Sequence, residues 1–303
     1  MQTRDSNVAP SLAWGRHYAM VRPDHFRVDY AINPYMSPAR QPDLRRAATQ
    51  WGHLVDVVES CGARVDVLEQ RPDSPDMVFA MNLGLALSDG GRARIAMSHM
   101  RYPQRRQETG SAAAWFDQAG FAPVYIGRDG IGPHLEAGDA LPFAGSVVVG
   151  HGPRTEDLAL KHLATEFGIA VRGVRLTHPG FYHLDLAFCP LDARHALVCP
   201  AAFDEASAES LLALVPEPLV LTEAEAMTFC ANAIVIGRTV IMPVCPDRVR
   251  AQLEAWDFEV RVIDVSEFHK GGGSVRCLTN PLDINVGRDL AAVPGGDVLL
   301  PVD

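Results

Sequence analysis

One order of secondary-structure elements recurs along the chain, and it constrains the fold more than any single motif does. Apolar periodicity predicts two neighbouring strands, a helix with one apolar face and a further strand, after which the order begins again. The pattern starts with a strand at Tyr18–Val21, a helix over 42–61 and a strand at Ala63–Leu68. The later units are Val78–Leu87, Ala93–Ser98, Gln104–Ala119 and Ala122–Ile126; Ala137–Phe143, Ser146–Gly150, Thr155–Phe167 and Ile169–Val174; His183–Cys189, Ala196–Cys199, Asp204–Leu214 and Pro218–Leu221; and Ala231–Ile236, Thr239–Pro243, Asp247–Trp256 and Glu259–Asp264.

Five such units predict a closed ring, because one unit alone would leave a face of its sheet exposed to water. We therefore expect a five-bladed pseudosymmetric α/β propeller with a polar central channel. The alternative is a mixed α/β sandwich without internal symmetry. Residues 1–17 are expected to form a loose N-terminal tail, and residues 18–303 a single catalytic α/β-propeller domain.

Charge and cysteine content narrow the function classes. The formal net charge is −10, which argues against nucleic acid as the main partner and favours cationic small molecules. No apolar run reaches the length of a membrane span, and the N-terminus lacks an apolar signal core, so no membrane partner is expected. The six cysteines show no CxxC spacing, which predicts free thiols in a reducing cytoplasm. Assembly into a homo-oligomer is left open.

Reactive side chains gather at the junctions between units, where the loops of a ring would meet at its centre. Each junction carries Asn, Asp, Glu, His or Cys close to the start of a strand. The junction residues are Asn33; Asp76 and Asn82; His134, Glu136 and Asp139; His183 and Asp185; Cys230 and Asn232; and finally Cys277, which follows Gly271-Gly272-Gly273. The three glycines would let this last loop turn tightly or approach a ligand closely.

A cysteine, a histidine and several carboxylates form a coherent chemical set. A thiolate can attack an electrophilic carbon while histidine protonates the leaving group and later activates water. Surrounding carboxylates would oppose the oxyanion of an acyl transfer, but they suit a cationic guanidinium, whose N–H groups match a carboxylate and whose charge lowers the pKa of a nearby thiol. Cys189 and Cys230 lie in apolar runs typical of a core, whereas His25, His134 and His269 compete with His183 as the base. No metal site is expected, because metal-like His and Cys spacing is lacking.

Seven segments together carry a resemblance to a known superfamily that covers nearly the whole chain from about Tyr18. They are Pro23–Phe26 with Ile32–Met36, Pro75–Phe79, Arg105–Glu108, Leu135–Asp139, Gly152–Thr155, His183–Asp185 and Lys270–Thr279. In these segments the chain resembles the guanidine-modifying enzymes with the pentein fold. These include dimethylarginine dimethylaminohydrolases, arginine deiminases, arginine dihydrolases and, more distantly, amidinotransferases. The resemblance implies a ring of ββαβ units around a central site and no metal or organic cofactor.

The resemblance also implies roles for matching residues. Cys277 resembles the nucleophile that forms a covalent thiouronium intermediate, and His183 the general acid and base. Glu136 matches the acidic residue that binds the guanidinium, and Asp185 or Asp139 would orient His183 or complete the guanidinium site. Arg154, or less strongly Arg106, matches an arginine that pairs with the substrate's α-carboxylate, and Asn33 would line the site.

One position departs from the pattern. Asn82 stands where deiminases and dimethylarginine hydrolases carry a guanidinium-binding aspartate, and similar asparagine-bearing sequences occur among arginine dihydrolases. A neutral amide could hold both a guanidinium and a neutral ureido group, so two rounds of hydrolysis are a hypothesis. Dimethylarginine hydrolases often carry an acidic residue where this chain has Met81, which weakens the assignment of dimethylarginine as the substrate. The expected activity is hydrolysis of C–N bonds in arginine or an Nω-methylarginine. The alternatives are an amidinotransferase and a non-catalytic arginine-binding module.

Overall fold

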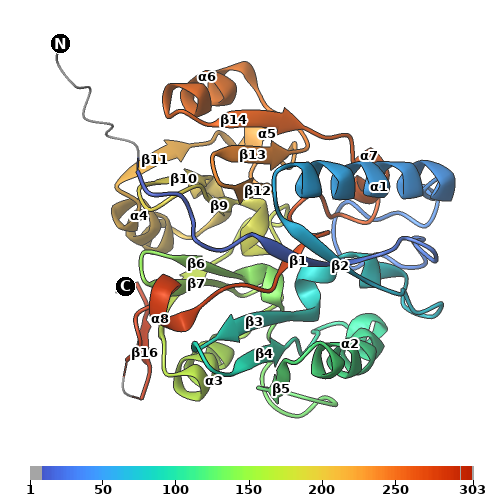
Figure 1. The fold of residues 1–303 in the computed structure, drawn as a ribbon, viewed down its shortest axis with the longest axis horizontal. Helices are drawn as coiled ribbons and strands as arrows, with labels where there is room; N and C mark the ends of the chain where they lie inside the picture. The colour runs from blue at the N-terminus through green and yellow to red at the C-terminus, as the bar shows by residue number, and fades with distance from the viewer. Residues whose placement is uncertain (1–8, 294, 302–303) are drawn as a thin grey trace.

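The computed structural model describes residues 9–293 and 295–301, and these residues form five small sheets arranged as a ring (Figure 1). Each sheet joins an antiparallel strand pair to a parallel strand. The sheets consist of β15 (Asn280–Pro281), β1 (His17–Val21) and β2 (Arg64–Leu68); β3 (Gly84–Ser88), β4 (Ala93–Met97) and β5 (Ala122–Tyr125); β6 (Ala140–Phe143), β7 (Ser146–His151), β8 (Ala170–Arg175) and β16 (Asp297–Leu299); β9 (Phe188–Pro190), β10 (His195–Val198) and β11 (Glu217–Val220); and β12 (Ile234–Ile236), β13 (Thr239–Met242) and β14 (Glu259–Val262). The five-bladed α/β propeller is confirmed, and the sandwich alternative is excluded.

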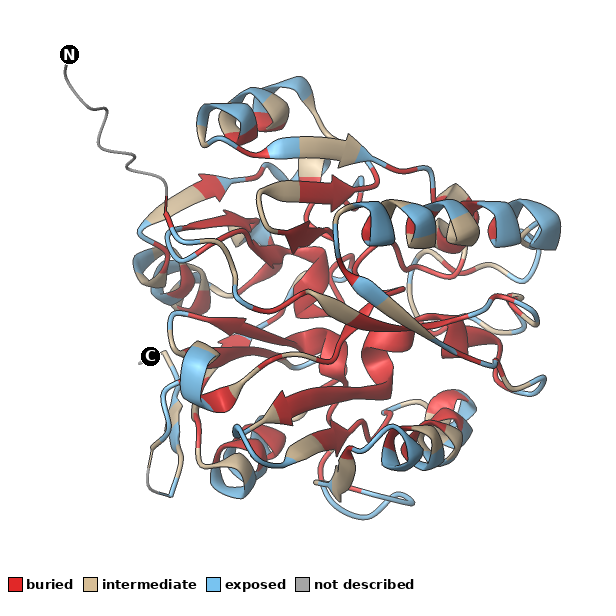
Figure 2. Cartoon of the chain, viewed as in Figure 1, coloured by how far each residue is buried: buried red, intermediate tan, exposed pale blue. Residues whose placement is uncertain are grey.

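A helix connects the two parallel strands of each sheet and lies at the periphery of the ring (Figure 1). These helices are α1 (Leu44–Ser60), α2 (Arg106–Gln118), α3 (Asp157–Phe167), α4 (Glu205–Leu214) and α6 (Asp247–Ala255). In α1, the side chain of Asp43 caps the N-terminus by accepting from the backbone N–H of Arg46, and Ala47, Leu54 and Val58 form the buried stripe. Figure 2 shows the consequence: the helices expose their outer faces, while the inner strands and central turns are buried.

The ring closes through residues from opposite ends of the chain. Strand β15, which follows Cys277, pairs antiparallel with β1 through Tyr18 with Pro281 and Ala19 with Asn280. The first sheet therefore takes its antiparallel partner from the C-terminal part of the chain. The remaining short helices are α5 (Glu223–Ala226), α7 (Ser266–His269) and α8 (Val286–Asp289), and β16 extends the third sheet by pairing in parallel with β8.

The structure corrects the predicted starts of several inner strands. The first halves of the expected strands at 78–87, 137–143 and 183–189 are 3₁₀ turns. These turns are η1 (Pro75–Val78), η2 (Ala80–Leu83), η4 (Ala137–Asp139) and η5 (Leu184–Leu186). The chain over 231–233, the expected start of another strand, also lies outside any strand. Two further 3₁₀ turns, η3 (Pro103–Arg105) and η6 (Pro200–Ala202), precede α2 and α4. These turns are buried near the ring centre, where neighbouring blades are too crowded for a continued ladder and polar side chains satisfy the backbone.

The N-terminal segment is more ordered than expected over its described part. Residues 1–8 of the predicted tail lie outside the described residues, but Trp14 is buried, and the N–H groups of Gly15 and Arg16 both donate to the Asp283 carboxylate. Residues 9–16 are thus attached to the ring. Within the described chain, no helix has the length and apolar character needed to cross a membrane.

Candidate active site

Cys277 lies buried at the centre of the ring, held by groups from two other blades. Its Sγ accepts a hydrogen bond from Nδ2 of Asn232 at 3.1 Å and donates to Oδ2 of Asp185 at 3.4 Å. Asn232 also accepts the backbone N–H groups of Arg276 and Cys277 through Oδ1, at 3.0 and 3.2 Å. Asn232, a junction residue to which the sequence analysis assigned no role, therefore fixes both the backbone and the sulfur of the cysteine.

The glycines before Cys277 are required by close packing. A Cβ at Gly272, whose φ is +90°, would lie 2.6 Å from the side-chain amide of Asn33. A Cβ at Gly273 would collide with the ring of Phe79 and stand 3.1 Å from Cβ of Cys277. The glycines thus permit close packing against side chains of other parts of the ring, whereas the predicted close approach to a ligand stays a prediction.

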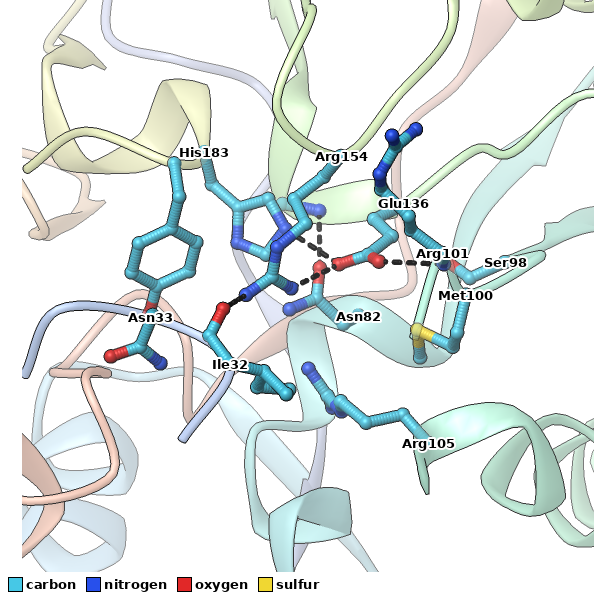
Figure 3. A network of polar contacts seen from close by, with 12 residues as sticks. Ile32, Asn33, Asn82, Ser98, Met100, Arg101, Arg105, Glu136, Arg154 and His183 are labelled. Atoms are coloured by element: carbon cyan, nitrogen blue, oxygen red, sulfur yellow. Dashed lines mark hydrogen bonds and ion pairs between the residues drawn. The ribbon is translucent and has the colours of Figure 1, made fainter. Parts of the chain in front are cut away.

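His183 forms the second part of the site through its contact with Glu136. Its Nε2 lies 2.7 Å from Oε2 of Glu136, while the same carboxylate accepts from Arg154 Nη1 at 2.9 Å and from the backbone N–H of Arg101 at 3.0 Å (Figure 3). Arg154 also donates to the carbonyl of Ile32 at 2.8 Å. Both oxygens of Glu136 are thus engaged by the protein, so its position suits orienting His183 better than binding a guanidinium.

The charge states of these groups follow from burial and their neighbours. Burial raises the pKa of the Cys277 thiol well above its ordinary value, and the nearby Asp185 raises it further. Burial also raises the pKa of Asp185, although His183 and Arg276 oppose this. For Glu136, burial alone would raise the pKa, but Arg154 and His183 outweigh it and hold that pKa below its usual range. Glu136 is therefore ionised, whereas Cys277 is a neutral thiol in the free site.

Asn82 and Asp139 have their oxygens committed to backbone and hydroxyl donors. Oδ1 of Asn82 accepts the N–H of Gly138 at 2.8 Å, which leaves the NH₂ group of the amide as the part able to contact a ligand. Asp139 accepts from the N–H of Leu184 at 2.9 Å and from the hydroxyl of Thr155 at 2.7 Å. Asp139 therefore supports the turn that follows His183 and does not contact the His183 ring by any hydrogen bond in the described residues.

A small, narrow pocket connects several of these groups. It is lined by Ile32, Asn33, Asp76, Phe79, Asn82, Arg105, Arg154, Tyr182, His183, Gly271, Gly273 and Cys277. Asn33 lines the pocket as expected, but its Nδ2 donates to the carbonyl of Gly271 at 3.1 Å. The lining side chains nearly fill this space, and only a small molecule matches a site of this kind.

Two lining residues, Arg105 and Asp76, were given no role by the sequence analysis, although Asp76 was named at a unit junction and Arg105 lies in a segment that carries the resemblance. Arg105 is buried and forms two hydrogen bonds to Glu108, at 2.9 and 2.8 Å, whereas the expected Arg106 points to another hollow and donates to the carbonyls of Met100 and Arg101. Burial raises the pKa of Asp76, opposed by Arg105, and Oδ1 of Asp76 has no hydrogen-bond partner among the described residues. The segment 105–108 indicated that an arginine of this region belongs to the site, but only the 3₁₀ turn before α2 decides which of the two arginines turns inward.

The described residues contain no group of three or more His, Cys, Asp or Glu side chains arranged to hold a metal ion. The remaining histidine candidates also lie apart from the pocket lining: His269 contacts Ser274 Oγ at 3.1 Å, and His134 stacks on His99 with ring centroids 4.5 Å apart. His183 is the histidine that lines the pocket with Cys277.

The chain forms a five-bladed α/β ring, and its centre holds a cysteine, a histidine bound to glutamate, and further carboxylates. This combination defines the guanidine-modifying enzymes of the pentein fold. The sequence profile of the family described as N,N dimethylarginine dimethylhydrolase, eukaryotic, matches residues 22–284. The chain therefore belongs to the dimethylarginine dimethylaminohydrolase family, and with it to the hydrolases that act on C–N bonds of guanidino compounds.

Individual relatives fall into two groups. The N(G),N(G)-dimethylarginine dimethylaminohydrolase of Mycobacterium tuberculosis is 37% identical over 264 residues, which cover 87% of this chain and 85% of the relative. The bifunctional arginine dihydrolase/ornithine cyclodeaminase ArgZ of Synechocystis is 33% identical over 265 residues, 86% of this chain but 37% of the relative. The chain thus spans somewhat over a third of the length of that bifunctional enzyme.

Solved structures extend the likeness to the arginine dihydrolases. A mutant N-terminal domain of ArgZ bound to substrate superposes with a TM-score of 0.83 at 31% identity, covering 89% of this chain and 99% of the domain. Another variant of that domain, covalently bound to a reaction intermediate, gives the same TM-score and identity over 89% of this chain and 98% of the domain. A mutant of AgrE in complex with L-arginine has a TM-score of 0.85 at 31% identity, covering 91% of this chain and 41% of AgrE.

Proposed function

We propose that this enzyme hydrolyses the guanidine group of arginine, with Cys277 as the nucleophile and His183 as the general acid and base. The observation that carries the proposal is the arrangement of the Cys277 thiol, 3.4 Å from the Asp185 carboxylate, in one enclosed pocket with a histidine that Glu136 orients. A cationic, planar electrophile is the ligand that this charge pattern stabilises.

The first half-reaction follows from these charges. A bound guanidinium places a positive charge beside the Cys277 thiol and so opposes the burial and the Asp185 charge that keep it protonated. The sulfur attacks the guanidine carbon, a C–N bond breaks, and His183 protonates the departing nitrogen. The thiol proton ends on the leaving ammonia, and the thiouronium on Cys277 keeps the positive charge of the substrate.

The second half-reaction releases the product. Water attacks the thiouronium carbon while His183 takes one of its protons, and the C–S bond breaks to leave a neutral ureido group. The sulfur leaves as the thiol with the second proton of the water, and the proton held by His183 passes to solvent, which accounts for the positive charge of the thiouronium. Glu136 does not touch the substrate in this scheme. Its 2.7 Å contact with Nε2 fixes the orientation of the His183 ring, and Nδ1 is the nitrogen that we propose transfers protons.

We further propose that arginine is hydrolysed twice, to citrulline and then to ornithine, ammonia and carbon dioxide. Asn82 supports this step, because its oxygen is occupied by Gly138 N–H and its NH₂ group can donate to the ureido oxygen of bound citrulline. Solved structures of arginine dihydrolase domains resemble this chain at 31% identity, which adds support.

The opposite end of the pocket suits an amino-acid head group. Arg105 is already paired with Glu108, but it lies in the pocket lining together with Asp76, whose Oδ1 is buried without a partner among the described residues. We propose that Asp76 accepts the α-ammonium group and that Arg105 and Arg154 supply the positive field for the α-carboxylate.

Product analysis by mass spectrometry tests both proposals. The wild-type enzyme should convert arginine to citrulline and ornithine, and Asn82→Asp should stop at citrulline, because a carboxylate repels the ureido oxygen. Clean arrest of the wild-type enzyme at citrulline would refute double hydrolysis, whereas release of dimethylamine from asymmetric dimethylarginine in preference to arginine turnover would assign a dimethylargininase.

The two remaining alternatives have their own outcomes. Transfer of the amidino group to added amines, with little ureido product, would establish an amidinotransferase. Binding of arginine by both wild type and Cys277→Ser without turnover by either would establish a binding module.

The six cysteines are all free thiols in the structure, and we propose a reducing, cytoplasmic location, which cell fractionation tests.

A further inference from the structure

Tyr182 is a buried residue of the pocket lining to which no role in catalysis has been given. It directly precedes His183, and the centroids of the two rings are 4.8 Å apart. Its hydroxyl and its ring contact two different parts of the active site.

The hydroxyl of Tyr182 holds the loop that carries the nucleophile. It donates to the carbonyl of Gly272 at 2.7 Å, and Asn33 Nδ2 donates to the preceding carbonyl, that of Gly271, at 3.1 Å. Two consecutive carbonyls of the glycine segment are therefore fixed by side chains of other blades. Cys277 follows five residues later, so the path of this segment sets where the thiol lies.

The ring of Tyr182 supports the acid–base side of the site. The guanidinium carbon of Arg154 lies 4.7 Å from the centroid of the Tyr182 ring and 4.7 Å from that of Tyr102, so the cation is held between two aromatic faces. Arg154 in turn binds Glu136, whose carboxylate orients His183. One side chain thus contacts both the nucleophile loop and the support of the general acid and base.

We propose that Tyr182 is a positioning residue that sets the placement of the Cys277 loop relative to His183, a role that rests on the proposed hydrolysis. The hydroxyl is a donor throughout the neutral range, because burial raises the pKa of Tyr182 well above its ordinary value. A shift of about 1 Å between reacting groups lowers a rate by roughly 10²-fold, so the single hydrogen bond to Gly272 has a measurable effect on turnover.

The test compares Tyr182→Phe with Tyr35→Phe. Tyr35 is a matched control, because its hydroxyl also donates to a glycine carbonyl, that of Gly180 at 3.0 Å, and its ring lies 6.4 Å from that of Tyr182. Both variants keep the aromatic ring. Tyr182→Phe loses the hydrogen bond to Gly272, and Tyr35→Phe loses the one to Gly180 together with a 3.5 Å contact to Sδ of Met227. We expect Tyr182→Phe to lower kcat by roughly 10- to 100-fold with KM within about threefold, and Tyr35→Phe to change both by less than about threefold.

Hydrogen exchange of the backbone amides over 271–277 supplies a readout that needs no turnover. Exchange in this segment should be faster in Tyr182→Phe than in the wild type and unchanged in Tyr35→Phe. Equal exchange in the wild type and Tyr182→Phe, or equal loss of kcat in both variants, overturns the positioning role. Failure of the wild-type enzyme to act on any guanidine substrate overturns the proposed function instead, and the exchange result still decides the role of Tyr182.

Discussion

Removal of the Asp185 charge should change the reactivity of Cys277 in opposite directions for neutral and cationic reagents. In the free enzyme the carboxylate disfavours the thiolate, because Oδ2 lies 3.4 Å from Sγ and both groups are buried. With a cationic ligand the same carboxylate is attractive. Asp185→Asn keeps the shape of the side chain and deletes the charge.

The magnitude follows from the separation. Two unit charges 3.4 Å apart interact by about 5 kcal/mol at an effective dielectric constant of about 20. Relaxation and partial protonation of Asp185, whose pKa burial raises, reduce this value. A quarter of it still corresponds to nearly a tenfold change in rate, since about 1.4 kcal/mol is a factor of ten.

The assay uses two alkylating agents of the same shape, neutral chloroacetamide and cationic chloroacetamidine, with covalent labelling of Cys277 followed by mass spectrometry. The wild-type enzyme should favour the cationic reagent. In Asp185→Asn we expect labelling by the neutral reagent to accelerate by about tenfold, the preference for the cation to shrink by at least that factor, and arginine turnover to fall.

An unchanged ratio of the two labelling rates in Asp185→Asn would refute the electrostatic reasoning. Slower labelling by both reagents would show that Asp185 acts on Cys277 through geometry alone. Circular dichroism of the variant controls for loss of the fold.

Two further predictions concern stability and packing. Burial raises the pKa of Asp139 from 3.8 to about 7, so its contribution to folding is fully present below about pH 4 and is lost as pH rises through 7. Denaturation of Asp139→Asn and wild type should show the variant gaining relative stability between pH 4 and 8, by up to about 4 kcal/mol, and a constant difference would contradict this. Gly273→Ala should destabilise the protein by about 1–3 kcal/mol and lower kcat by more than about tenfold, because the new Cβ collides with Phe79. The control Gly91→Ala, whose new Cβ meets nothing within 4 Å, should change neither stability nor kcat. Full activity of Gly273→Ala would contradict this account of the packing.

The sequence was sufficient to predict the ring and the main reactive groups, because both depend on local periodicity and on the kinds of residue at each junction. Cys277 and His183 line one pocket, and Glu136 contacts His183, although the three residues lie on three different blades; their catalytic roles stay predictions. The repeat order predicted that junctions converge without specifying any individual contact.

The details that escaped prediction depend on tertiary context. Arg105 and Arg106 are neighbours with identical side chains, and only the turn before α2 directs the first inward. The expected strand starts became 3₁₀ turns, because the crowded ring centre satisfies their backbone groups with side chains such as Asn82 and Asp139. Glu136 was expected on the guanidinium, but its side-chain partners Arg154 and His183 could be identified only in three dimensions.

The closure of the ring by β15 has a consequence for biosynthesis. Cys277 lies on the segment that joins the fifth sheet to the strand that completes the first, and β15 pairs with β1 across nearly the whole length of the chain. Contacts of such long sequence separation form late, because the closure entropy of the intervening chain must first be overcome. A chain still emerging from the ribosome therefore has no assembled pocket, and the thiol becomes competent only after synthesis passes Pro281.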